Sequence, residues 1–134
     1  MAKILVVEDN PANMKLAEML LRKAGHSVLS AVDAEAGLTM ARAERPDLIL
    51  MDIQLPGMDG LAATVLLKQD PSTSSIPVIA LTAMAMSDDR EKARLAGCDG
   101  YLAKPLRYHD FYAAIEAELP RMESQSGTIQ ADAG

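Results

Sequence analysis

The chain has 134 residues, a formal net charge of −6 and 49% hydrophobic residues. This length fits one domain, and the apolar fraction suffices for a globular core, which excludes a wholly disordered chain. The acidic balance argues against a nucleic-acid-binding protein, and the single cysteine, Cys98, excludes an internal disulfide or a multi-cysteine zinc site.

Five short apolar runs along the chain are typical of buried parallel strands. They cover residues 4–7, 28–31, 48–51, 78–81 and 101–103. Helix-length segments follow the runs, and the first of them begins at Pro11 and is terminated by Gly25, while Leu16, Ala17, Leu20 and Ala24 form its expected buried face. The other four predicted helices cover residues 34–43, 60–69, 87–96 and 108–119.

This repeated alternation predicts an α/β fold of the flavodoxin-like (βα)5 type. Its doubly wound parallel sheet has the strand order 2-1-3-4-5, with helices on both faces. Residues 1–120 are predicted to form the domain, and residues 121–134, which lack apolar periodicity, a flexible C-terminal tail. The apolar runs are too short to span a membrane and no secretory signal peptide is evident, so a cytoplasmic location is expected.

Charged and polar side chains follow the strands at their carboxyl ends, where open α/β sheets bind ligands. Glu8 and Asp9 follow the first run, and Asp52 follows the third. Thr82 follows the fourth run and Lys104 the fifth. Because the first and third strands are neighbours in the predicted order, the three carboxylates should approach one another. Mg²⁺ is the natural partner of such a group, since it prefers oxygen ligands.

Each of these residues also has a simpler interpretation when it is taken alone. Asp9 is equally suited to cap the following helix, Lys104 to lie in solvent, and Thr82 to occupy a turn. Asp52 is different, because it follows a buried apolar run and its carboxylate needs a partner there. The joint pattern is therefore more specific than any one member.

The residues around these positions resemble the receiver domain of two-component response regulators, and especially the single-domain regulators of the CheY/DivK-like type. The resemblance covers about residues 3–119. It is carried by four segments: residues 6–10 (Val-Val-Glu-Asp-Asn), 50–60 (Leu-Met-Asp-Ile-Gln-Leu-Pro-Gly-Met-Asp-Gly), 80–83 (Ala-Leu-Thr-Ala) and 101–105 (Tyr-Leu-Ala-Lys-Pro).

The resemblance implies a metal-dependent phosphoacceptor site. Asp52 is expected to accept the phosphoryl group. Asp9, Asp52 and the backbone carbonyl of Gln54 are expected to bind Mg²⁺ (or Mn²⁺), and Glu8 to hold the ion through water. The Gln54 side chain and Met84 occupy positions that adjust the lifetime of the acyl phosphate, in a direction that the residue types do not reveal.

The resemblance also implies a conformational switch. Thr82 and Lys104 are expected to contact the phosphoryl oxygens, and Pro105 to follow a cis peptide bond that aims the lysine. Thr82 moves inward on phosphorylation and Tyr101 rotates with it, which repacks the face formed by the fourth helix, the fifth strand and the fifth helix.

Partners follow from the same resemblance. A histidine kinase or a histidine phosphotransfer protein is expected to supply the phosphoryl group. It is expected to dock at the first helix, where Asn13, Met14 and Leu21 are the candidate exposed contacts. Since no DNA-binding domain is expected after residue 119, output is expected through a downstream protein partner, with no nucleic acid and no membrane span.

Three other functions compete with a phosphoacceptor that is not an enzyme in the usual sense. An aspartyl-nucleophile phosphatase typically uses Asp-x-Asp, whereas Gln54 takes the second position here. A flavodoxin-like FMN carrier needs a Ser/Thr/Gly loop where this chain has Glu8 and Asp9. A Ser-His-Asp hydrolase is not supported, because His26 and His109 lie away from the strand ends and are expected at the surface.

Overall fold

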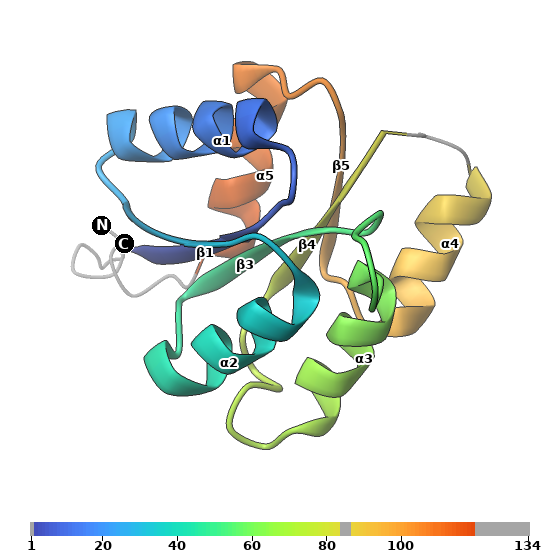
Figure 1. Ribbon diagram of the computed structural model, residues 1–134. Coiled ribbons are helices and arrows are strands. Elements are labelled where there is room, and N and C mark those ends of the chain that lie inside the picture. Colours follow the sequence, from blue (N-terminus) through green and yellow to red (C-terminus); the bar gives the residue numbers. More distant parts are fainter. Residues whose placement is uncertain (1, 84–86, 120–134) are drawn as a thin grey trace, which may run out of the picture.

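A computed structural model describes residues 2–83 and 87–119 of the chain. Its five parallel strands form one sheet in the order β2-β1-β3-β4-β5, as the sequence predicts (Figure 1). The strands are β1 (Lys3–Val7), β2 (Ser27–Ala31), β3 (Leu48–Asp52), β4 (Val78–Thr82) and β5 (Gly100–Ala103). The central strand β3 and its neighbour β4 are buried along their whole length, which is why their sequences are continuous apolar runs.

Five helices connect and cover the strands. They are α1 (Pro11–Lys23), α2 (Ala34–Glu44), α3 (Gly60–Gln69), α4 (Ser87–Ala96) and α5 (Tyr108–Glu118). Three of them begin at a side chain that accepts hydrogen bonds from the first turn: Asn10 for α1, Asp33 for α2 and Asp59 for α3. Gly25 follows α1 with a φ of 91°, a left-handed conformation that favours glycine. The predicted element boundaries are thus confirmed to within a residue or two.

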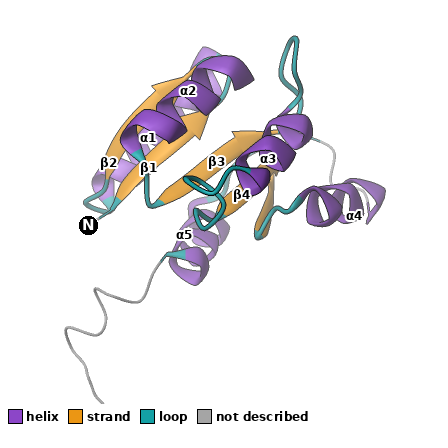
Figure 2. Ribbon diagram, turned by 90° about the horizontal axis from the view of Figure 1, so that it is seen from below, coloured by secondary structure: helices purple, strands orange, loops and turns teal. Residues whose placement is uncertain are grey.

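The sheet lies between two layers of helices (Figure 1), and an apolar cluster fills the space on each of its faces. On one face α1 and α5 pack against alternate residues of the strands, including Ile4, Val6 and Leu50. On the other face α2 and α3 pack against the intervening residues, including Leu5 and Met51. Alternate side chains of a strand point to opposite faces, so both sets are buried at once. A third, smaller cluster lies under α4, which Figure 2 shows at the margin of the molecule beyond α3.

Some predictions about single residues were wrong. Leu21 is fully buried and Ala24 is exposed, so the buried face of α1 is rotated towards Ala17, Leu20 and Leu21. His26 is half-buried, and its Nδ1 accepts a hydrogen bond from the backbone N–H of Ala2, whereas the expected surface position is confirmed for His109.

Two expectations lie outside the described residues, namely the role of Met84 and the character of the tail at residues 121–134. Within residues 2–83 and 87–119, no helix has the length and apolar character needed to cross a membrane.

Candidate functional site

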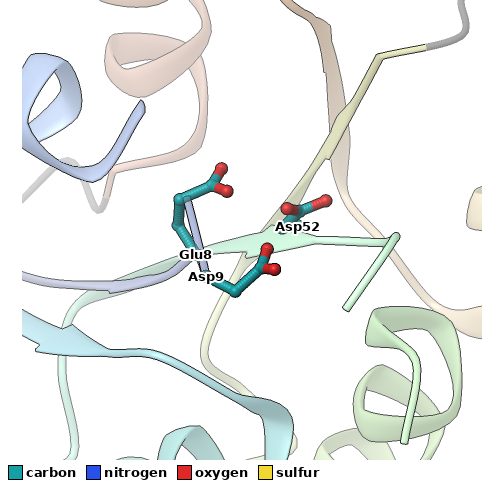
Figure 3. A group of neighbouring side chains, drawn as sticks. All are labelled: Glu8, Asp9 and Asp52. Atoms are coloured by element: carbon teal, nitrogen blue, oxygen red, sulfur yellow. The ribbon is translucent and has the colours of Figure 1, made fainter. Parts of the chain in front are cut away.

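The carboxyl ends of β1 and β3 bring three acidic side chains together. The register of the two strands pairs Val7 with Met51, so the residues that follow them lie side by side at the same edge of the sheet. One carboxylate oxygen each from Glu8, Asp9 and Asp52 lies within 4.8 Å of the others, and Figure 3 shows the three groups around a common space. The predicted convergence of the three carboxylates is confirmed.

Lys104 brings a positive charge into this cluster from the end of β5. Its Nζ lies 2.8 Å from Oε1 of Glu8 and 3.0 Å from Oδ2 of Asp52. Both carboxyl groups are almost fully buried, with 2% exposure for each residue, so water screens these ion pairs poorly. The interpretation of Lys104 as a solvated lysine was therefore wrong. The peptide bond between Lys104 and Pro105 is cis, as expected.

Hydrogen bonds fix the orientation of the two buried carboxylates. Oδ1 of Asp52 accepts a bond from the backbone N–H of Gln54 at 2.9 Å, and Oδ2 accepts one from Lys104. Oε2 of Glu8 accepts a bond from the backbone N–H of Asn10 at 3.1 Å. Oε1 of Glu8 is buried and, among the described residues, meets Lys104 as an ion pair without the geometry of a hydrogen bond.

Burial and charge act on the site in opposite directions. Burial raises the pKa of Glu8, and the contacts with Lys104 and the Asn10 N–H offset this only in part, with the neighbouring Asp52 carboxylate raising it further. Burial lowers the pKa of Lys104, but its contacts with Glu8 and Asp52 outweigh that effect and hold the pKa above its usual range. Lys104 therefore stays cationic and holds the acidic groups together.

Asp9 does not cap helix α1, although its position shortly before the helix suggested that role. The cap of α1 is Asn10, whose Oδ1 accepts hydrogen bonds from the N–H groups of Ala12 and Asn13 at 2.9 and 3.1 Å. The interpretation of Asp9 as the helix cap was wrong. Its exposed carboxylate is available at the mouth of the cluster.

Thr82 and Tyr101 occupy the neighbouring strands β4 and β5. Thr82 is fully buried at the end of β4, and its carbonyl accepts a bond from the N–H of Lys104 at 2.7 Å. Tyr101 is half-buried, and the guanidinium of Arg90 lies 5.0 Å from the centre of its ring. Burial and the charge of Asp89 raise the pKa of Tyr101, while a hydrogen bond with the Thr82 side chain opposes the shift.

Sequence reasoning did not assign a role to two residues that shape the site. Asn10 caps α1 and orients Glu8; an asparagine directly before a proline at the first helical position is a signal that could have identified it. Gly60 begins α3 against the backbone of β3, where a Cβ atom would overlap the carbonyl oxygen of Asp52. No local pattern reveals that contact, because the sheet creates it.

The donor set fits a hard divalent cation. Three carboxyl groups face one ammonium group, so negative charge is in excess, and all the side-chain donors are oxygens. The buried Oε1 of Glu8 has no hydrogen-bond donor among the described residues, which suits a water molecule of a hydrated ion. Mg²⁺ meets each of these conditions.

The fold and site define a doubly wound α/β protein with an acidic, cation-compatible centre at the carboxyl edge of its sheet. The sequence matches the response regulator receiver domain over residues 4–116, and the chain belongs to this family. It is the receiver domain of a DivK-like response regulator. Members of the family bind Mg²⁺ and accept phosphate from a kinase-type partner.

Individual relatives agree with this assignment. The polar-differentiation response regulator DivK of Brucella anthropi is 44% identical over 116 residues, which are 87% of this chain and 94% of that protein. The solved receiver domain of a Pseudomonas aeruginosa sensor histidine kinase, with magnesium coordinated in its active-site cleft, is 38% identical with a TM-score of 0.81, covering 87% of this chain and 96% of that one. A Vibrio cholerae chemotaxis protein, 25% identical, has a TM-score of 0.84 and covers 89% and 99%.

Proposed function

We propose that this chain is a stand-alone response regulator of a two-component system or phosphorelay, with Asp52 as its phosphoacceptor. The observation that carries the proposal is the arrangement of Asp52, which lies buried among Glu8, Asp9 and Lys104 at the carboxyl edge of the sheet. A buried carboxylate surrounded by both acidic and basic groups suits transfer of a highly charged group. Residues 1–120 form the functional domain in this proposal.

In the transfer step, a carboxylate oxygen of Asp52 forms the new bond to phosphorus. The bond from phosphorus to the donor breaks, and its electron pair leaves with the donor atom, which is a histidine nitrogen in a kinase or phosphotransfer protein. Asp52 ends the step as an acyl phosphate. Lys104 already contacts Asp52, so its ammonium is placed to neutralise charge that develops on the phosphoryl oxygens.

Asp9 and Asp52, with the backbone carbonyl of Gln54, are the proposed ligands of Mg²⁺, and Glu8 is proposed to contact the ion through water. When bound, the cation supplies charge neutralisation for the phosphoryl oxygens. The relative from Pseudomonas aeruginosa with magnesium in its cleft supports this assignment. The chain's own residues provide the rest: Gln54 and Lys104 orient the nucleophile, and Asn10 orients Glu8.

The proposed output is a change in the populations of two conformations of the domain. Thr82 and Tyr101 are proposed to convert this change into a different surface for a protein partner. The Thr82 side chain lies beside Tyr101, so a change in its hydrogen bonding alters what Tyr101 contacts. Phosphorylation shifts the population only to the extent that the phosphoryl group interacts better with one state than with the other. Asn13 and Met14, both half-buried on α1, remain the proposed contacts for the phosphoryl-donor protein. Leu21 is no longer a candidate, because its side chain is fully buried.

The test uses acetyl phosphate with Mg²⁺ and mass spectrometry of the intact protein. We expect one phosphoryl adduct, its loss in Asp52→Asn, and slower formation in Lys104→Ala. Asp88→Asn, which changes an exposed acid on α4, serves as the matched control and should label like the wild type. Undiminished labelling of Asp52→Asn would sink the site assignment, and multiple-turnover hydrolysis of a phosphate ester would favour the phosphatase alternative.

A further inference from the structure

Helix α4 is attached to the protein less firmly than the other helices near the site. Among its described side chains (residues 88–96), Ala93 alone is buried, and Leu95 is 70% exposed. An open surface pocket of about 340 Å³ lies on its β5 side, and its lining includes Arg90, Arg94 and Tyr101. Figures 1 and 2 both show α4 at the edge of the molecule. Because the helix buries few apolar side chains and borders a solvent-filled pocket, it has room to shift.

The C-terminal end of α4 is, by contrast, held by a network of polar contacts. Lys68, near the end of α3, places its Nζ 3.0 Å from Oδ2 of Asp99 and donates to the carbonyl of Ile76 at 2.8 Å. The same Oδ2 accepts a bond from the N–H of Val78 at 2.9 Å, and the N–H of Asp99 donates to the carbonyl of Val78 at 2.7 Å. One lysine thus joins α3, the entry of β4 and the loop after α4.

Two further observations concern the contacts of Lys68 at this junction of α3, the start of β4 and the loop after α4. Gly97, with a φ of 107°, follows α4, and a Cβ atom there would lie 2.8 Å from Cγ of Lys68. The lysine stem therefore passes directly against the end of the helix. Burial and the charge of Asp99 raise the pKa of Glu118 at the end of α5, whereas Lys68 lowers it. Lys68 thus forms an ion pair with Asp99 and interacts electrostatically with Glu118 on another element.

The two ends of α4 lie at opposite edges of the sheet. The junction fixes the helix end beside Val78, the first residue of β4, whereas the helix begins after Thr82, the last residue of β4, at the edge that carries Asp52. Between these ends, Ala93 packs in one small cluster with Ile53, the residue that follows Asp52. Among the described residues, Ala93 therefore connects the middle of α4 with the chain next to Asp52, while the far end of the helix is held by the junction.

We propose that the Lys68–Asp99 ion pair is the fixed point of α4, about which the beginning of the helix shifts when the Asp52 site is occupied. Such a shift changes the contact between Arg90 and Tyr101, because Arg90 lies in the part of α4 that is not tied down. This inference rests on the proposed function, and it assigns to Lys68 a positioning role at a distance from the site. In this proposal, the junction determines which part of the α4 surface changes when the Asp52 site is occupied.

Hydrogen–deuterium exchange of the full chain, with and without Mg²⁺ and beryllofluoride, tests the proposal. In the wild type we expect the probe to change exchange at residues 88–92 and to leave residues 95–99 unchanged. In Lys68→Met, which keeps the apolar stem, exchange at residues 95–99 should rise about fivefold without the probe, and the probe should now alter them as well. Asp99→Asn, which keeps an acceptor for Val78, should act in the same direction if Lys68→Met folds poorly.

Arg42→Met is the matched control, because it removes an ion pair of the same 3.0 Å length, with Asp70, on the other side of α3. It should leave α4 exchange as in the wild type. Two outcomes would overturn the proposal about Lys68 and Asp99 but not the proposed function. One is unchanged exchange at residues 95–99 in both Lys68→Met and Asp99→Asn. The other is a change in exchange, caused by the probe in the wild type, that is spread evenly over α4. Fluorine NMR separates these from a failure of the proposed function, in which the wild type forms no beryllofluoride adduct and both proposals fall.

Discussion

The ammonium of Lys104 lies 3.0 Å from Oδ2 of Asp52 and joins the end of β5 to the end of β3 across the intervening strand β4. The pair is partly buried, and the same ammonium contacts Glu8 at 2.8 Å. A buried ion pair contributes modestly to folding as a whole, but removing one partner leaves a charge without compensation. Lys104 thus has a structural role in the absence of any phosphoryl group.

Replacing Lys104 by methionine should destabilise the protein strongly. The change leaves Glu8 and Asp52 buried beside each other without a cation, and we expect the free energy of unfolding to fall by about 3 kcal/mol. Urea denaturation measures this loss, and Mg²⁺ should restore part of it because a cation can again face the carboxylates. Lys15→Met, an exposed position on α1, should change stability by less than about 0.5 kcal/mol. An equal effect of both variants would contradict the prediction.

Asp9→Asn should separate metal binding from folding. Asp9 is exposed and caps no helix, so the variant should unfold within about 0.5 kcal/mol of the wild type in the presence of a chelator. Its dissociation constant for Mg²⁺, measured by calorimetry, should rise about tenfold or more, because one charge close to the ion is lost.

Metal removal gives the same prediction a second readout. Chelation should lower the melting temperature of wild type prepared in Mg²⁺, and should lower that of Asp9→Asn much less. Asp88→Asn, with a similarly exposed carboxyl on α4, is the control and should bind Mg²⁺ as the wild type does. Tight Mg²⁺ binding by Asp9→Asn would remove Asp9 from the ligand set.

Gly60→Ala should disturb the site through the backbone. The new methyl group would overlap the carbonyl oxygen of Asp52, so α3 or the end of β3 must move. We expect a loss of about 3 kcal/mol in the free energy of unfolding and slower labelling of Asp52 by acetyl phosphate. Gly25→Ala provides the contrast, since nothing lies within 4 Å there; it should cost about 1 kcal/mol for its left-handed φ and leave labelling unchanged. Wild-type labelling by folded Gly60→Ala would refute the positional argument.

The Cys98 thiol should react slowly with alkylating reagents in the folded protein. It should also lower the free energy of unfolding as the pH becomes alkaline. Burial raises the pKa of the Cys98 thiol above its ordinary value, and a hydrogen bond with Thr64 opposes the shift. Well below the ordinary pKa of a cysteine, the thiol is neutral in both the folded and the unfolded state, and it does not affect stability. As pH rises further, the unfolded thiol ionises first, so the folded state loses stability.

Iodoacetamide alkylation as a function of pH checks this prediction. The midpoint for the native protein should lie above that for the urea-unfolded protein, and Cys98→Ala should reduce the loss of stability at alkaline pH. Coincident midpoints for the native and unfolded chains would show that burial does not shift the thiol.

Much of the architecture was predictable because its signals are local. The five apolar runs, Pro11 and Gly25 around the first helix, and the acidic residues after the strands are each visible within a few positions. The choice between Asn10 and Asp9 as the cap of α1 was less accessible, since both are suitable residues at adjacent positions. Similarly, the burial of Leu21 depends on how α1 rotates against the sheet and α5, which periodicity defines only coarsely.

By itself, the sequence determined that strands and helices alternate, that the sheet is parallel, and that Glu8, Asp9 and Asp52 stand at strand ends. Tertiary structure alone decided that Lys104 is bound between Glu8 and Asp52 and that Lys68 is bound to Asp99. Those contacts join residues far apart in the chain. They depend on strand register, on helix rotation and on the packing that excludes water from the ion pairs. Local residue patterns define strand register and helix rotation only coarsely, whereas the packed sheet sets all three at once.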